Sequence, residues 1–136
     1  MDHPALQIKS YQDLIAWRKA ISLVTEIDKI TVQFPKHEMY GLSSQLQRAS
    51  VFIASNIAEG HGRAMPGEFA QFLGQARGSL CEVETQIVIA RELAHIVPGQ
   101  SSALMARTDQ LGRILNGLIS AIQRRKSRRT TLVSNP

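Results

Sequence analysis

The sequence predicts an all-α fold, an antiparallel up-down-up-down four-helix bundle that assembles as a homo-oligomer. The composition is helical in character, with 43% hydrophobic residues, only 5% aromatics and many Leu, Ile, Ala, Gln, Glu and Arg. Four segments repeat apolar residues every three or four positions, and the short connections between them favour antiparallel neighbours. A chain of 136 residues has room for one core.

The first helix is predicted to begin near Ser10 and to end just after Phe34. Ser10 and Asp13 have the spacing of a capping box, in which each side chain accepts a hydrogen bond from a backbone donor. Pro35 disfavours helical geometry at the residue before it. The expected inward-facing residues are Leu14, Trp17, Ile21 and Val24.

The second helix, residues 42–60, is the most informative segment because it carries only two charges, Arg48 and Glu59. Its inward stripe is Leu42, Leu46, Ala49, Ile53 and Ile57. The other side is also apolar or small and holds Val51, Phe52, Ala54, Ser55 and Ala58. Such a helix is normally buried on more than one side, so we expect the second side to contact another copy. The alternative is a weakly patterned helix.

The third helix is predicted to run from Pro66 to about His95, after a turn at 60–62 whose two glycines tolerate positive φ. Its apolar stripe is Phe69, Phe72, Leu73, Ala76, Leu80, Val83, Ile87, Ala90 and Ala94. Gly67, Gly74 and Gly78 lie on the opposite side. Because a glycine inside a helix costs about 0.5–1 kcal/mol, we expect another backbone to approach Gly74 and Gly78, unless the cost is merely tolerated.

The fourth helix is predicted over residues 101–123, after a turn at Pro98-Gly99. Its inward residues are Leu104, Leu111, Leu115, Leu118 and Ile122. We therefore divide the chain into a bundle domain, residues 1–123, and a basic C-terminal segment, residues 124–136.

The formal net charge of +5 is confined to that segment. Residues 1–123 hold 11 basic and 11 acidic side chains and are formally neutral. The excess comes from Arg124, Arg125, Lys126, Arg128 and Arg129. Such a run contacts nucleic-acid phosphates in many proteins. A solvated tail, or cations placed favourably at a helix C-terminus, is an equal alternative. The sequence leaves open whether 124–129 continues the helix or is disordered.

Several classes of function find no support in the sequence. No apolar run is long enough to span a membrane, residues 1–10 do not resemble a secretion signal, and the single Cys81 fits an inert thiol in a cytoplasmic protein. His3, His37, His61 and His95 are scattered, without metal-ligand spacing on a helix. We predict no catalysis, no cofactor and no metal site.

Several strings resemble one family. They are FPKHEMYGL at 34–42, QLQRA at 45–49, SNIAEG at 55–60 followed by Arg63, and ARGSL at 76–80 followed by Glu82. Together they resemble the bacterial four-helix-bundle proteins encoded in intervening sequences of 23S rRNA genes. Phe52 and Ala54 depart from the common Ser and Pro, and the basic tail lies outside the pattern. The resemblance implies a homopentamer of unassigned role, with nucleic-acid binding expected.

The signature residues allow two interpretations. They are Arg48, Asn56, Glu59, Gly60, Ser79 and Glu82. We favour a structural role, in which Asn56, Ser55, Glu59, Arg63 and Ser79 form a buried hydrogen-bond network. The alternative is a ligand or RNA surface, for which the turn before Gly62 is the best candidate because its backbone donors lie beside Arg63.

Two functional hypotheses remain. The first is an oligomer that binds RNA or DNA through the basic segment, with Arg63 as a further contact. The second is an oligomeric scaffold or accessory subunit for a protein partner. A related barrel-forming family serves the reverse transcriptase of diversity-generating retroelements in this way, which makes such an enzyme the example of a partner. The sequence specifies neither an RNA target nor a base preference.

Overall fold

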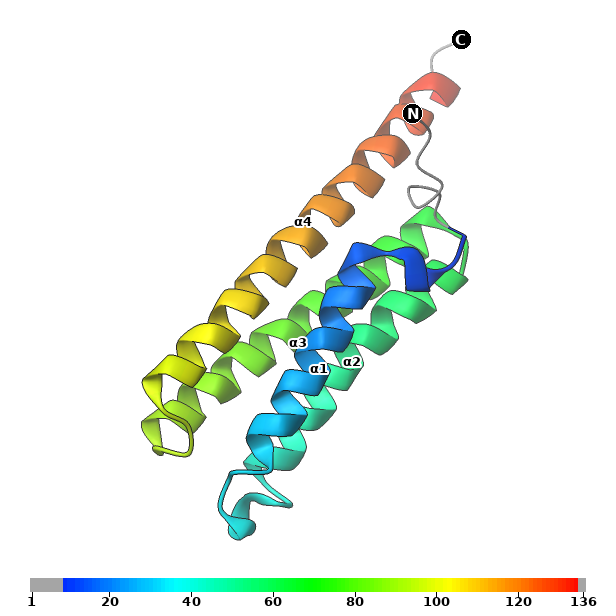
Figure 1. Ribbon diagram of the computed structural model, residues 1–136. Helices are drawn as coiled ribbons and strands as arrows, with labels where there is room; N and C mark the ends of the chain where they lie inside the picture. Colours follow the sequence, from blue (N-terminus) through cyan, green and yellow to red (C-terminus); the bar gives the residue numbers. More distant parts are fainter. Residues whose placement is uncertain (1–8, 135–136) are drawn as a thin grey trace, which may run out of the picture.

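The computed structural model describes the backbone of residues 9–134 and the side chains of residues 9–128. Four α-helices account for most of this part, and it contains no strand (Figure 1). They are α1 (Ile15–Thr31), α2 (Leu42–Gly62), α3 (Pro66–Glu92) and α4 (Pro98–Ser134). Two short 3₁₀ helices, η2 (Tyr11–Asp13) and η3 (Lys36–Glu38), precede α1 and α2. The all-α prediction is confirmed.

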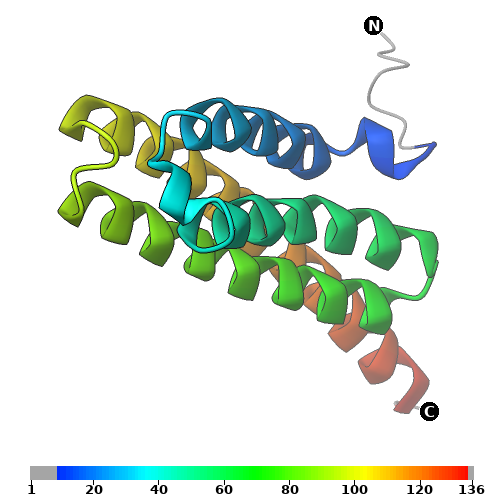
Figure 2. The ribbon, with the colours of Figure 1, turned by 90° about the horizontal axis from the view of Figure 1, so that it is seen from below.

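Each helix packs against the next along the chain, and α1 also packs against α4 (Figure 2). One hydrophobic core runs between them. The core includes all five predicted inward residues of α2, whose side chains are between 0% and 7% exposed. Steps of three and four residues between apolar side chains were enough to identify this face.

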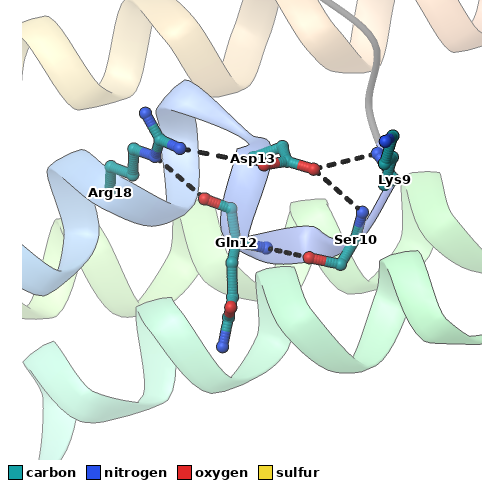
Figure 3. A network of polar contacts seen from close by, with 5 residues as sticks. All are labelled: Lys9, Ser10, Gln12, Asp13 and Arg18. Carbon is teal, nitrogen blue, oxygen red and sulfur yellow. Dashed lines mark hydrogen bonds and ion pairs between the residues drawn. The ribbon is translucent and has the colours of Figure 1, made fainter. Parts of the chain in front are cut away.

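The capping box at the start of the chain is present as predicted (Figure 3). The Ser10 hydroxyl accepts from the Gln12 N–H at 3.2 Å, and the Asp13 carboxylate accepts from Ser10 at 3.2 Å and Lys9 at 2.9 Å. These backbone donors, with Arg18 nearby, lower the pKa of Asp13 below its usual value. The box caps η2, and α1 begins two residues later at Ile15.

Of the four inward residues predicted for the first helix, Leu14 is buried. The other three are displaced from the buried face of α1 by about one residue, a rotation of about 100°. Ile21 is 37% exposed, and Trp17 and Val24 are only partly buried. The buried residues of the helix are Ala16, Ala20, Leu23, Ile27 and Thr31. Small alanines let α1 approach its neighbours closely, while Trp17 covers the core from the flank and stacks edge-on against Tyr11 at 5.3 Å.

The turn between α2 and α3 also differs from the prediction. Gly60 and Gly62 belong to α2, and no described glycine has positive φ. The left-handed residue is Ala64, at φ 61°. Gly60 serves another purpose, because a Cβ there would lie 2.6 Å from the Cβ of Phe72 in α3. Glycine at this position therefore allows α2 and α3 to approach each other closely.

The remaining boundaries shift for local reasons. Helix α3 starts at Pro66 as predicted but ends at Glu92, and Ala94 has a left-handed φ of 59° instead of joining the apolar stripe. Pro98 begins α4 instead of forming a turn, which agrees with the preference of proline for the first helical position. Within α4, Leu118 is only partly buried, and Ile119 lies in the core.

Candidate functional site

The basic segment continues α4 as a helix. Helix α4 has 37 residues against 27 in α3 and runs through Gln123 without interruption to Ser134. Its last turns project beyond the α2–α3 turn (Figure 1) and diverge from the other helices (Figure 2). The last core residue of α4 is Ile122. The cations that follow therefore lie on a helical segment that continues past the core.

The basic residues do not share one environment. Arg124, Arg125 and Arg128 are exposed, whereas the side chain of Arg129 lies outside the described residues. Lys126 is exposed too. It follows Ile122 by four residues, so it lies on the side of α4 that faces the other helices. A Cβ at Gly67 would lie 3.3 Å from the Lys126 Nζ. Lys126 therefore lies beside the start of α3, and the arginines provide the outward charge.

Arg63 lies at the α2–α3 turn, and two neighbours hold its side chain. Its guanidinium is 3.0 Å from the Glu59 carboxylate, and its Cζ is 5.3 Å from the centre of the Phe72 ring. Glu59 and Arg63 are four positions apart, so one helical turn brings their side chains together. Because both side chains are about half exposed, the pair contributes little stability on its own. It nevertheless offsets the charge that Arg63 would offer to phosphate.

The predicted buried network around Asn56 is wrong. Ser55, Glu59 and Arg63 are exposed, and the Asn56 amide donates to its own helix at the carbonyl of Phe52, 2.9 Å away. Of the other signature residues, Arg48 and Glu82 are exposed and Ser79 is partly buried. Gly60 is buried and has a clear structural role in the α2–α3 contact. The remaining signature residues, which are polar, form no buried cluster that could fix the register of the helices.

The outer side of α2 carries the predicted subunit-contact residues. Phe52 is 53% and Val51 48% exposed, Ser55 is exposed and Ala58 is half-buried. A shallow hollow of about 400 Å³ lies on this side. Its lining residues are Ser44, Gln47, Arg48, Val51, Phe52 and Ser55. Ala54 is a correction, because it is 6% exposed and packs in the chain's own core.

Gly74 and Gly78 of α3 face open space in the described part of the chain. A Cβ at Gly74 or Gly78 would meet no described atom of another helix within 4 Å. Neither glycine is therefore needed for packing between helices of the same chain. Cys81, on the same helix, is exposed, so its thiol is not part of the chain's own core.

One cluster was not predicted from the sequence. His37, Glu38 and His95 offer ligand atoms that all lie within 4.8 Å of one another. His37 and Glu38 belong to η3, and His95 lies between α3 and α4. Figure 1 places both connections at the same end of the bundle. Sequence spacing could not reveal the cluster, because Glu38 and His95 are 57 positions apart.

Glu38 connects this cluster to the start of α2. Its Oε2 is 2.9 Å from the Nε2 of His95, and its Oε1 accepts from the Leu42 N–H at 3.3 Å. The His95 hydrogen bond, and after it the Leu42 N–H, lowers the pKa of Glu38 below the usual range. A Cβ at Gly41 would lie 2.9 Å from Oε1, so glycine leaves room for this carboxylate.

The comparison with known proteins agrees with the fold and the signature strings. The sequence matches the family described as 23S rRNA-intervening sequence protein over residues 12–117. The chain belongs to this family. The match ends before the last part of α4, so the basic residues lie outside it. No curated protein matches the sequence.

A solved structure supports the assignment at the level of fold. It is a protein with unknown function from the S23 ribosomal protein family of Bacteroides thetaiotaomicron. The TM-score is 0.72 at 17% sequence identity, and the match covers 78% of this chain and 96% of the other.

None of the helices in the described part of the chain has the length and apolar character needed to cross a membrane.

Proposed function

We propose that this member of the 23S rRNA-intervening sequence protein family forms an antiparallel up-down-up-down bundle that assembles into a homopentamer. The topology is supported by the short connections at 63–65 and 93–97 and by the packing of each helix on the next. The colours in Figure 1 run in opposite directions along consecutive helices, which agrees with this topology. The subunit number is the expectation carried by the family resemblance.

The surface proposed for assembly is the outer side of α2. Val51 and Phe52 expose apolar side chains around a hollow, in a helix where only the opposite face is needed for the chain's own core. Light scattering at micromolar concentration measures the mass of the assembly, and the mass of a monomer would refute the proposed oligomer.

Phe52→Glu is expected to lower the mass of the assembly. Val32→Glu, at an exposed apolar residue outside this surface, is the control and is expected to leave that mass unchanged.

We further propose that the assembly binds nucleic acid, RNA in the first instance, through the end of α4. The observation that carries this proposal is the exposure of Arg124, Arg125 and Arg128 on a helix that continues past the last core residue. Arginine forms paired hydrogen bonds with phosphate and is weakly hydrated, which suits backbone contacts. Five such tails in one assembly would raise avidity for a long strand.

A neutralised variant tests this proposal while keeping the helix intact. Replacing Arg124, Arg125 and Arg128 by Gln retains good helix formers and removes three charges. If each cation neutralises one phosphate, the slope of log K against log salt becomes shallower by about 2 for single-stranded RNA. The control replaces three exposed cations elsewhere, Lys19, Lys36 and Arg107, by Gln. Equal loss in the two variants would contradict a site on α4.

The alternative is an oligomeric accessory subunit for a protein partner such as a reverse transcriptase. The observation that favours it is the exposure of apolar side chains outside the assembly surface, among them Leu93 and Val97 at the α3–α4 connection. The two functions separate in one comparison. If the intact protein binds neither RNA nor DNA at low salt, the accessory role is preferred. We propose a cytoplasmic location and no catalytic step in either case.

A further inference from the structure

The end of the bundle that holds the α1–α2 and α3–α4 connections contains two imidazoles and a carboxylate. His37 is exposed on η3, while the side chains of Glu38 and His95 are only 15% and 10% exposed. Their ligand atoms lie within 4.8 Å of one another. Imidazole nitrogen and carboxylate oxygen are the ligands that zinc and related divalent transition metals bind in proteins.

The spacing within the cluster suits a single metal ion. Ligand atoms about 2.0–2.1 Å from a tetrahedral metal lie about 3.3 Å from one another. The Nε2 of His95 and the Oε2 of Glu38 are 2.9 Å apart, so an ion can be accommodated by a small separation of the two groups. The ring centroids of His37 and His95 are 6.1 Å apart. Because His37 is exposed, its ring can turn toward the other two without disturbing the core.

Two of the three ligands are already held in place. The second oxygen of Glu38 accepts the Leu42 N–H, and the ring of His95 packs against Phe34 at a centroid distance of 5.3 Å. The left-handed Ala94 reverses the chain just before His95, whose own N–H returns to the Ala90 carbonyl at 2.9 Å. Hydrogen bonds and packing that orient ligands in this way strengthen metal binding in proteins.

We propose that His37, Glu38 and His95 bind one divalent transition metal ion of the zinc class, with a fourth position left to solvent. The ion joins η3 to the α3–α4 connection in place of the direct contact between Glu38 and His95. Binding to the folded state alone stabilises the fold by mass action. Mg²⁺ and Ca²⁺ are not expected to replace it, because both prefer oxygen ligands.

Zinc titration of the full chain without a polyhistidine tag tests this site. A competing chromophoric chelator reports the affinity, and we expect one Zn²⁺ per chain, a rise in melting temperature with Zn²⁺ and no rise with Mg²⁺. His37→Gln removes a ligand at an exposed position, so the fold is expected to survive. Affinity is expected to fall at least about tenfold, since even outer-shell changes cost 10–100-fold.

Two matched variants separate this site from accidental binding. His61→Gln removes a histidine of α2 whose ring packs against Phe69 of α3, and Cys81→Ser removes the exposed thiol. Both are expected to bind Zn²⁺ as the parent does. Visible absorption of the Co²⁺ form gives a second measurement, with tetrahedral bands present in the parent and lost in His37→Gln. Absence of binding, unchanged affinity in His37→Gln, or loss of binding in Cys81→Ser would overturn the proposal.

Discussion

The two ends of the bundle are fastened by different interactions. At the end with η3, polar pairs join the connections, through His95 with Glu38 and Gln100 with Gln33. At the other end, α2 and α3 meet at Gly60 with no room for a Cβ. Aromatic contacts complete that junction, with His61 against Phe69 and Arg63 over Phe72.

This difference determines what each end responds to. The polar end depends on a carboxylate and an imidazole, so acid and metal ions act on it. The Gly60 junction depends on close contact between helices, which pH and salt affect little. Past the Gly60 junction, α4 continues to Ser134 and exposes Arg124, Arg125 and Arg128. Substitutions at the polar end, at the Gly60 junction and at the end of α4 are therefore expected to change different measured properties.

The largest expected effect is the loss of nucleic-acid binding when residues 124–136 are removed. Residues 1–123 are formally neutral, so truncation is expected to abolish most non-specific binding. The intact chain is expected to show a salt slope of up to about −3.5 for single strands, or about −4.5 for duplex, per chain engaged. Filter binding at several salt concentrations measures both. Equal affinity of the two proteins would place the site on the bundle.

The next largest effect is expected for Gly60→Ala, at the junction of α2 and α3. The added Cβ lies 2.6 Å from the Cβ of Phe72, an atom that can move only with its backbone. Overpacking of this kind costs about 1–3 kcal/mol in unfolding free energy, despite the better helix propensity of alanine. Urea unfolding measures the loss, which is expected to be equal at pH 7 and pH 4. Gly62→Ala is the control, because its Cβ would meet open space.

Glycines that face outward give a smaller effect whose sign is informative. Gly74→Leu and Gly78→Leu raise intrinsic helix propensity by up to about 1 kcal/mol. If another copy packs there, both are expected to weaken assembly. Gly117→Leu in α4, also open in the single chain, is the matched control and is expected to gain stability without loss of mass. A higher melting temperature with unchanged mass at Gly74 or Gly78 would rule out close packing there.

The smallest expected effect is the pH dependence of the polar end. Glu38 has a pKa below its ordinary value of 4.5, so its stabilising contribution is complete above that value. The contribution is lost as pH falls through the lower pKa of the folded protein. Glu38→Gln is therefore expected to be less stable than the parent at pH 7, with the difference closing in acid. Exposed Glu82→Gln is the control, and a difference that persisted in acid would contradict the role of ionisation.

Local patterns in the sequence were sufficient for much of the fold. The capping box at Ser10, the start of α3 at Pro66 and the complete inward stripe of α2 follow from the sequence and are confirmed. Each depends on residues within one or two helical turns. The inward residues predicted within α1 were wrong because Ala16 and Ala20 carry little hydrophobic signal in the sequence. Close packing between helices nevertheless favours small residues at these positions.

Interactions between distant segments required the tertiary structure. Gly60 resembles a turn glycine until α3 is placed against α2, and Ala54 resembles a surface residue until the core is assembled. The His37, Glu38 and His95 cluster depends on two connections meeting at one end of the bundle. The sequence by itself determined the presence of four helices, the family of the protein and the confinement of the net positive charge to the C-terminal segment. These properties depend on local patterns or on sums over residues. Only the tertiary structure decided which glycine is a contact and which histidines are neighbours, because both depend on distances between residues remote along the chain.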